Sequence, residues 1–389
     1  DAYSRFSPNK IGVTATTSGP GILNIMQGVA CSFFDSIPTF HFVGAVVTKQ
    51  LRQNKNIRQI GFQEMEVVDI VKPITKYAVL LKDKNMIKYE LQKMLYYAKE
   101  GRPGPVLMDL PDDIQRAEIN PKKLKSFKPP KKNNNKISFE KKFFELLKNS
   151  KRPLILVGHG INLSNTKKEL YKFITKTGIP FSPSWATIDL FFGKNKMNAG
   201  TFGVAATRYG NFAIQNADLL ISLGCRLNTQ ITGSNLDSFA PKAKKIVVDI
   251  DINEFKKTNG LKYDLKINID LKDFFKKIIP KIKNYKNYKN YGEWIKKFKE
   301  WKIKYPIVEE KYYSQSKSCN PYVFFKTLSD NTNKNDVIIP DASANLIWAM
   351  QSLEPNKQKI FTALNHSPMG YSMPATVGAY LADKSKNVI

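Results

Sequence analysis

Residues 11–24 read IGVTATTSGPGILN, and the organisation of the chain is best understood from this stretch. Its first part is small and β-branched, which is typical of a buried strand. A glycine–proline turn follows, and helical apolar spacing then continues to residue 34. Gly19 and Gly21 can adopt backbone angles closed to other residues, and Pro20 fixes its own φ. The pattern can present backbone N–H groups to a ligand, although an ordinary strand-to-helix connection would look the same.

Composition narrows the class of protein. The chain has 389 residues, enough for two or three domains, and no run of about 18 uncharged apolar residues that would predict a membrane span. The net charge is +29, but the lysines are spread among many asparagines, which indicates a compositional bias rather than a nucleic-acid-binding surface. We therefore expect binding to neither membranes nor nucleic acid.

The cysteines bear on the cellular compartment. Cys31, Cys225 and Cys319 lack metal-ligand spacing and indicate reduced thiols, so we expect a cytoplasmic protein. The first residue is Asp1 rather than Met, and both ends look cut, which leaves an organelle-targeting peptide open.

Strand-like and helical segments alternate along the chain, which predicts an α/β fold with parallel sheets. The three expected strands between residues 153 and 252 are apolar runs that end in Gly or Asp, an arrangement that places a ligand crevice at the carboxyl ends of the strands. Strands are expected at residues 11–16, 41–47, 105–110, 153–157, 217–223, 245–252 and 336–340, and helices at 22–34, 86–100 and 375–382.

Two lysine-rich stretches divide the chain into three parts. The first is also rich in Pro and Asn and predicts a solvated linker. The second carries Trp294 and Trp301 seven residues apart, and we expect these rings to pack a connecting helix onto the protein body, with cofactor stacking as the lesser alternative. The predicted division is domain 1–120, linker 121–136, domain 137–280, linker 281–319 and domain 320–389.

Several motifs follow one another in a set order. They are TSGPG at 17–21, GFQE at 61–64, ITK at 74–76, RPGPV at 102–106, GCRL at 224–227, DID at 249–251 and SPMGYSMPA at 367–375. In order and spacing this set resembles the thiamine-diphosphate-dependent enzymes of the acetolactate synthase (acetohydroxyacid synthase) large-subunit type. The resemblance implies three doubly wound parallel-sheet domains, pyrimidine-binding, central and diphosphate-binding, with the first and last truncated in this chain.

The resemblance also implies an activity. Pyruvate would be decarboxylated and joined to a second 2-oxo acid, which makes the protein a transferase or lyase of branched-chain amino acid biosynthesis. The implied cofactors are thiamine diphosphate and Mg²⁺, with FAD as a candidate. The implied partners are small 2-oxo acids, a second subunit in a homodimer or homotetramer, and a small regulatory subunit. Two alternatives stay open: another 2-oxo acid decarboxylase or carboligase, such as one for surface polysaccharide synthesis, and a non-catalytic nucleotide-binding subunit.

Matching positions carry implied roles in the first domain. Pro20 and Asn24 would lie beside the aminopyrimidine, and Phe62 and Gln63 would face the thiazolium. Lys76 would lie near the substrate entrance. A glutamine amide can donate a hydrogen bond to a developing alkoxide, whereas the alternative for Gln63 is a solvated loop residue.

The third part carries the other cofactor positions. Ser343, Ala344 and Asn345 occupy the turn that would meet the diphosphate. The family often has Gly-Gln-His at this turn, so the departure keeps the decarboxylase alternative open. Met369 would hold the cofactor in a bent conformation, and His366 precedes it; core packing is the alternative for Met369, and a structural role is the alternative for His366.

The central domain carries the positions that would line a flavin site, but His159 interrupts the usual glycine triplet and Asn228 replaces a commoner acid. A central domain without a nucleotide is therefore the alternative. The resemblance places the catalytic glutamate shortly before Asp1 and the Mg²⁺ ligands after Ile389, so no metal ligand is expected within this chain. The candidate flavin residues are Gly158, Gly160, Gly224, Arg226, Asp249 and Asp251.

Overall fold

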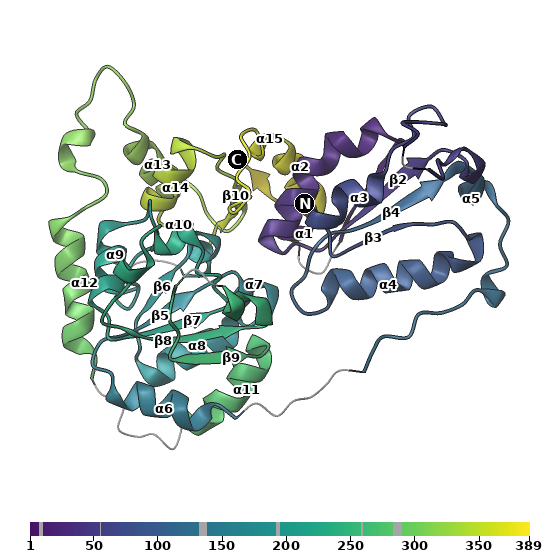
Figure 1. The fold of residues 1–389 in the computed structure, drawn as a ribbon. Coiled ribbons are helices and arrows are strands. Elements are labelled where there is room, and N and C mark those ends of the chain that lie inside the picture. The colour runs from purple at the N-terminus through teal and green to yellow at the C-terminus, as the bar shows by residue number, and fades with distance from the viewer. Residues whose placement is uncertain (8–10, 55, 132–137, 192–194, 258–259, 283–289) are drawn as a thin grey trace. The chain divides into compact units, whose positions relative to one another are not determined.

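The computed structural model describes residues 1–7, 11–54, 56–131, 138–191, 195–257, 260–282 and 290–389. They form two compact units: unit 1 is Asp1–Asn134 with Thr362–Val388, and unit 2 is Asn135–Phe361 with Ile389. Each unit is built of helices and parallel strands (Figure 1), so the predicted α/β class is confirmed. Parts of both predicted linkers, 132–136 and 283–289, lie outside the described residues.

The sheet of unit 1 has the strand order β1-β2-β4-β3. The strands expected at 11–16, 41–47 and 105–110 are all present, whereas β3, which has only four residues, was not predicted. The unit's main elements are β1 (Gly12–Thr16), α2 (Pro20–Asp35), β2 (Thr39–Ala45), α3 (Val67–Val71), β3 (Tyr77–Leu80), α4 (Ile87–Lys99), β4 (Val106–Pro111) and α5 (Asp112–Arg116).

Helices cover both faces of this sheet. On one face Val43 and Leu107 pack against Ile22 of α2 and Val67 of α3. On the other face α4 packs against the side chains of β4 that alternate with Leu107. Because both faces are buried, a ligand can approach this sheet only along its edges.

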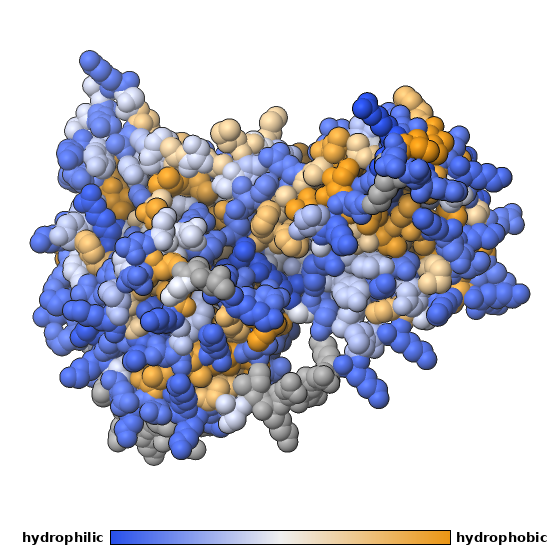
Figure 2. Space-filling model, in the orientation of Figure 1, coloured by the Kyte–Doolittle hydropathy of each residue, from blue (hydrophilic) through white to orange (hydrophobic). Residues whose placement is uncertain are grey.

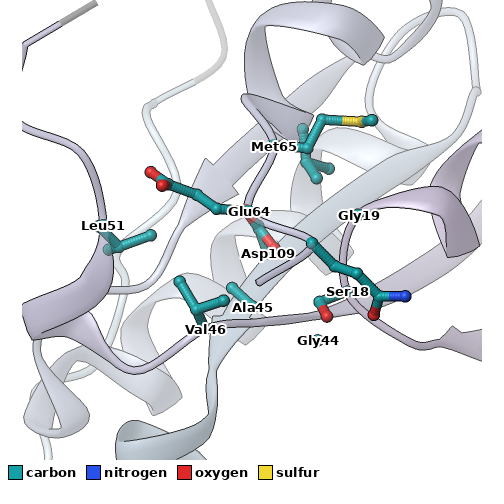
Figure 3. A pocket seen from close by; sticks show the side chains of 11 residues that line it. Ser18, Gly19, Gly44, Ala45, Val46, Leu51, Glu64, Met65 and Asp109 are labelled. Atoms are coloured by element: carbon teal, nitrogen blue, oxygen red, sulfur yellow. The ribbon is translucent and has the colours of Figure 1, made fainter. Parts of the chain in front are cut away.

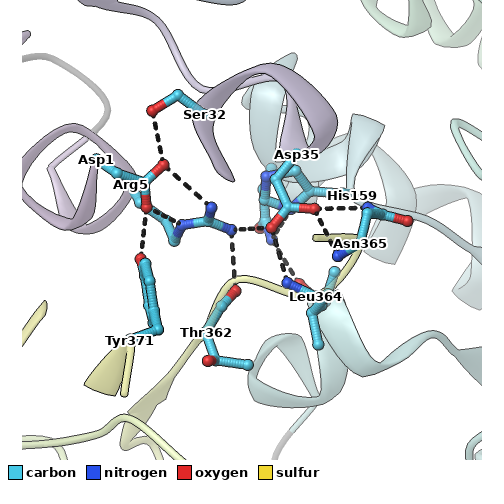
Figure 4. Close-up of polar contacts among 11 residues, drawn as sticks. Asp1, Arg5, Ser32, Asp35, His159, Thr362, Leu364, Asn365 and Tyr371 are labelled. Carbon is cyan, nitrogen blue, oxygen red and sulfur yellow. Dashed lines mark hydrogen bonds and ion pairs between the residues drawn. The ribbon is translucent and has the colours of Figure 1, made fainter. Parts of the chain in front are cut away.

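The segment 362–388 joins unit 1 through a buried polar network (Figure 4). Arg5, on α1 (Ala2–Phe6), places Nη1 2.8 Å from Oδ2 of Asp35 and donates to the carbonyl oxygen of Thr362. Asp35 also accepts hydrogen bonds from the backbone N–H groups of Leu364 and Asn365. Burial alone would raise the pKa of Asp35, but the Arg5 guanidinium and these donors hold it below its usual value. α15 (Ser372–Ala382) packs on α1.

Unit 2 contains a five-stranded sheet of order β6-β5-β7-β8-β9 whose central strands are buried. An aromatic core that includes Phe143, Phe173 and Phe274 packs helices against it. Its elements are α6 (Glu140–Asn149), β5 (Pro153–Val157), α7 (Gly160–Leu163), α8 (Lys167–Thr177), β6 (Phe181–Pro183), α9 (Arg208–Asn216), β7 (Leu219–Leu223), α10 (Thr229–Thr232), β8 (Lys244–Asp249), β9 (Leu265–Asn268) and α11 (Leu271–Ile282).

The tryptophan pair lies on α12 (Gly292–Lys304), and its predicted packing role is confirmed. The Trp294 indole N–H donates to the carbonyl oxygen of Pro153 at 3.1 Å, and its ring meets Phe298 edge to face at 4.8 Å. The indole is therefore used to fix the helix on the sheet, because a buried indole N–H needs an acceptor.

The rest of the chain is divided between the units. Residues up to Phe361 belong to unit 2, where β10 pairs in parallel with β11, and those from Thr362 to Val388 belong to unit 1. The three-domain division stays a prediction. The elements are α13 (Pro321–Asp330), β10 (Asp336–Ile338), α14 (Ala344–Ser352), β11 (Lys359–Ile360) and β12 (Asn387–Val388).

Hydrophilic side chains cover most of the face shown in Figure 2, with hydrophobic residues gathered in places on each unit. Across the described ranges, no helix has both the length and the apolar character needed to cross a membrane.

Candidate functional site

Two loops that carry predicted site residues touch each other in unit 1. The turn between β1 and α2 places Gly19 at φ 60°, ψ −106°, with Pro20 at the first helical position. A Cβ atom added to Gly19 would lie 2.2 Å from the carbonyl oxygen of Gln63. Only glycine permits both this backbone conformation and this close approach.

The loop that carries Gln63 is held by the next residue. The Glu64 carboxylate accepts hydrogen bonds from the backbone N–H groups of Arg52, Ile60 and Gly61. Gln63 itself has φ 64° and is half-buried, whereas Phe62 is 83% exposed. The loop therefore presents Phe62 and Gln63 on a backbone fixed by Glu64.

The structure brings four of the five predicted first-domain residues to these adjoining loops. Pro20 and Asn24 lie exposed on the first turns of α2, and Phe62 and Gln63 lie on the facing loop. The two loops follow the carboxyl ends of parallel strands β1 and β2 along the chain, the edge at which α/β sheets bind ligands.

A small hollow, open to solvent, lies where these loops meet the sheet (Figure 3). Its wall is mixed, with the hydroxyl of Ser18, the amide of Gln63 and two carboxyl groups among apolar side chains. It is lined by Ser18, Gly19, Gly44, Ala45, Val46, Leu51, Gln63, Glu64, Met65, Val67 and Asp109.

Asp109 is a member of this site that was not among the predicted site residues. It is 3% exposed, and its Oδ1 atom has no hydrogen-bond partner. Burial, with a smaller contribution from the negative charge of Glu66, raises its pKa to about 7. A hydrogen bond from the backbone N–H of Leu110 lowers the pKa but does not offset these two effects. The only sequence signal was an acid inside the apolar strand VLMDL, a pattern that also fits a structural aspartate.

Lys76 is not brought into the hollow. It directly precedes β3, its backbone N–H donates to the carbonyl oxygen of Pro105, and its Nζ donates to that of Glu100. Pro105 directly precedes β4, which runs parallel to β3, so Lys76 lies at the amino edge of the sheet and the hollow at the carboxyl edge.

The turn predicted to meet a diphosphate lies in unit 2, between β10 and α14. Ser343 caps α14 with φ 70° and ψ −149°, and its side chain makes no capping hydrogen bond. Ser343, Ala344 and Asn345 are all exposed. The exposed start of a nine-residue helix after a parallel strand is compatible with an anion.

His366 and Met369, the predicted site residues nearest the C-terminus, lie in unit 1. The His366 ring stacks on Phe34 of α2 with ring centroids 5.5 Å apart and an interplanar angle of 14°. Met369 is 83% exposed and is followed by Gly370 at φ 86°. The structure thus gives His366 a packing contact and leaves Met369 available to a ligand or a partner.

The candidate flavin residues of unit 2 gather at the carboxyl ends of β5, β7 and β8. The loops are tightly packed: a Cβ on Gly158 would lie 2.1 Å from the carbonyl oxygen of Gly224. The backbone N–H groups of Gly158, Gly160 and Gly224 donate to the carbonyl oxygens of Leu223, Gly224 and Val248, respectively. These three amides are therefore engaged within the protein and do not fit a pyrophosphate cradle.

The charged candidate flavin residues, Arg226, Asp249 and Asp251, also make contacts within the protein. Arg226 Nε lies 3.4 Å from Oε1 of Glu254. Asp249 accepts a hydrogen bond from the backbone N–H of Asp251, which in turn accepts one from that of Asn253. The close glycine contacts and these polar contacts hold the loops after β5, β7 and β8 together, and they do so without a nucleotide.

Two family descriptions match the chain. Residues 1–70 match "Thiamine pyrophosphate enzyme, N-terminal TPP binding domain", and residues 141–278 match "Thiamine pyrophosphate enzyme, central domain". These matches cover the hollow's loops from Ser18 to Val67 and the glycine corner of unit 2.

Curated relatives extend the similarity over the whole chain. It is 31% identical to the acetolactate synthase large subunit of Cyanidium caldarium and 30% identical to that of Lactococcus lactis subsp. lactis, and it spans 66% of each relative. It is 30% identical to the large subunit of Buchnera aphidicola subsp. Acyrthosiphon pisum, of which it spans 67%. The resemblance inferred from the ordered motifs is confirmed, and the chain belongs to the acetolactate synthase large-subunit family of thiamine pyrophosphate enzymes.

Proposed function

We propose that this chain belongs to a thiamine-diphosphate-dependent carboligase that decarboxylates pyruvate and joins the product to a second 2-oxo acid, forming acetolactate. The observation that carries the proposal is similarity to acetolactate synthase large subunits along the entire chain. The contact between the Gly19 turn and the Gln63 loop supports it, because it assembles polar and apolar groups around a small hollow.

When bound, thiamine diphosphate would supply a carbon nucleophile and a ring able to accept the electrons of decarboxylation. In a dimer, Pro20 and Asn24 of one subunit would flank its pyrimidine, and the exposed start of α14 at Ser343 of the other subunit would face its diphosphate. Gln63 would donate its amide N–H to the substrate oxygen where negative charge develops. A role for Lys76 at the substrate entrance stays a prediction, because Lys76 does not line the hollow.

The finer cofactor assignments belong to this proposal. Mg²⁺ would accompany the diphosphate, as it usually does in phosphate sites. FAD would lie at the carboxyl ends of β5, β7 and β8, but the engaged amides of Gly158, Gly160 and Gly224 weigh against it. The absorption spectrum of the purified full-length protein decides between a flavoprotein and a nucleotide-free central domain.

The subunit assignments are also proposals. A homodimer or homotetramer is supported by the exposed apolar residues Met373 and Val377 on α15, which are 81% and 59% exposed. The regulatory subunit and the cytoplasmic location stay predictions.

The test is a product assay on the full-length protein with pyruvate, thiamine diphosphate and Mg²⁺. Acetolactate supports the proposal; acetaldehyde supports the decarboxylase alternative. No product together with no thermal stabilisation by the cofactor supports the non-catalytic alternative.

A matched pair of variants tests the role of Gln63. Gln63→Ala should lower kcat about 100-fold, the usual cost of removing one donor to a developing oxyanion. Gln27→Ala, at an exposed position on α2, should not change kcat. Thermal stabilisation by thiamine diphosphate should persist in both variants. Equal kcat values for the two variants would exclude Gln63 from the reaction.

A further inference from the structure

The carboxyl group of Asp109 is aimed into the hollow of unit 1. Asp109 lies in β4, in register with Val43 of β2 and Leu80 of β3. Its neighbour Leu107, two residues earlier, packs under α2 and α3, so Asp109 faces the same side. Figure 3 shows its side chain between the segment that carries Glu64 and the turn at Ser18 and Gly19.

The charged groups around Asp109 are mostly acidic. Glu64 lines the same hollow, and Glu66 lies close enough to raise the pKa of Asp109 through its negative charge. Arg52, a cation of this region, is already engaged: its Nε lies 3.2 Å from Oε1 of Glu66, and its backbone N–H donates to Glu64. The Arg52 guanidinium is therefore paired with Glu66 rather than with Asp109.

A second buried aspartate in the same unit provides the contrast. Asp35 is 5% exposed, nearly as buried as Asp109, but it is paired with Arg5 and accepts backbone hydrogen bonds. Those partners keep Asp35 ionised. Oδ1 of Asp109 has no such partner. A carboxyl without a cation at this depth is stable mainly as the neutral acid, because burial of an uncompensated charge is costly.

We propose that Asp109 positions the substrate: as a neutral carboxylic acid, it keeps its proton and donates an O–H hydrogen bond to a 2-oxo acid bound at the hollow. The inference rests on the proposed function. Two properties follow from the neutral form. It offers a hydrogen-bond donor, and it keeps a negative charge off Asp109 in a wall that also holds the carboxyl group of Glu64, where an anionic substrate must bind.

The pH dependence of the full-length enzyme tests this role. In the wild type, kcat/KM for pyruvate should fall about tenfold per pH unit above pH 7 as Asp109 loses its proton. Most of the fall should be in KM, because ionisation repels the anionic substrate. Asp109→Asn keeps a neutral donor and should remove this descending limb, with kcat/KM at pH 6 within about threefold of the wild type.

Two further variants separate positioning from structure. Asp109→Leu lacks a donor and should raise KM at every pH. Asp112→Asn, three residues away at a side chain that is 45% exposed, should keep the wild-type pH profile. A wild-type profile in Asp109→Asn, or an unchanged KM in Asp109→Leu, overturns the proposal.

A separate measurement distinguishes failure of the proposed carboligase function from failure of the proposed role of Asp109. A wild-type protein that is stabilised by thiamine diphosphate and Mg²⁺ but does not consume pyruvate refutes the proposed carboligase. Asp109 is then tested with pyruvate as a ligand alone. Pyruvate should stabilise the wild type against heat below pH 7 and lose this effect above it, whereas Asp109→Asn should keep it. Equal stabilisation of the wild type at both pH values overturns the role of Asp109.

Discussion

The α-carbon of Gly19 lies so close to the backbone of Gln63 that a methyl group on it would stand 2.2 Å from the Gln63 carbonyl oxygen. Two loops separated by more than forty residues of sequence are thus in direct contact at one edge of a parallel sheet. The contact fixes the Gln63 backbone, which adopts the left-handed φ of 64°. Both loops carry residues that the family resemblance assigns to the cofactor.

Replacing Gly19 tests how tightly the two loops are coupled. Gly19→Ala should lower the free energy of unfolding by about 1–3 kcal/mol, because alanine disfavours φ 60° and its Cβ displaces Gln63. Urea denaturation of the full-length protein measures the change. Gly28→Ala is the matched control: Gly28 lies in the same helix with open space around it, so alanine should be neutral or stabilise by up to about 1 kcal/mol. Equal effects would contradict the contact.

Asp109 should make stability depend on pH. Its pKa is raised from 3.8 to about 7, so the folded state binds the proton more tightly than the unfolded state. The free energy of unfolding therefore falls as the pH rises from about 4 to about 7. Asp109→Asn does not titrate, so its stability relative to the wild type should increase by roughly 3 kcal/mol over this interval. Denaturation curves at pH 5 and pH 8 measure this difference, and a constant difference would contradict the raised pKa.

The Arg5–Asp35 pair should be essential for attachment of the segment 362–388. Arg5→Met leaves Asp35 buried without its cation and should cost about 3–5 kcal/mol. Since the pKa of Asp35 is lowered, its stabilising contribution is present at neutral pH and is lost as the pH falls through the acid range. Arg116→Met, at an exposed pair with Asp112, is the control and should leave the denaturation midpoint unchanged. Similar midpoints for both variants would refute the role of Arg5.

Backbone strain at Ser343 should be relieved by glycine. Its φ of 70° and ψ of −149° lie in a region that residues with a Cβ rarely adopt. Ser343→Gly should therefore stabilise the full-length protein by about 1 kcal/mol in urea denaturation. Ser343→Ala keeps the Cβ, and the serine side chain makes no capping bond to lose, so it should show no gain. A gain with alanine would indicate that the backbone is not the cause.

The exposed apolar residues Met373 and Val377 on α15 should contribute to subunit association. Met373→Lys and Val377→Lys place charges on an apolar surface and should shift the full-length protein toward monomers in light scattering. Ile303→Lys on α12 is the control, because Ile303 is 70% exposed and belongs to the other unit. A dimer that persists in both α15 variants places the interface elsewhere.

The α/β class and most long elements could be predicted from sequence because local pattern sets them. The strand β5 is a continuous apolar run, and the helix α4 repeats apolar residues at helical spacing. β3 was missed because four residues, Tyr77–Leu80, carry too little periodicity. The positions of Lys76 and Asp109 could not be predicted, because they depend on strand direction and on which residues surround each carboxyl and ammonium group.

By itself the sequence determined the family, the alternation of strands and helices, and the glycine turn that can approach another loop, since all three depend on the identity and order of residues. The tertiary structure alone decided which residues share the hollow. It placed Gln63 against Gly19, assigned Arg5 to Asp35, and left Asp109 buried without a cation. The physical reason is that burial and charge pairing arise between segments far apart in the chain, and these set the ionisation of a carboxyl group.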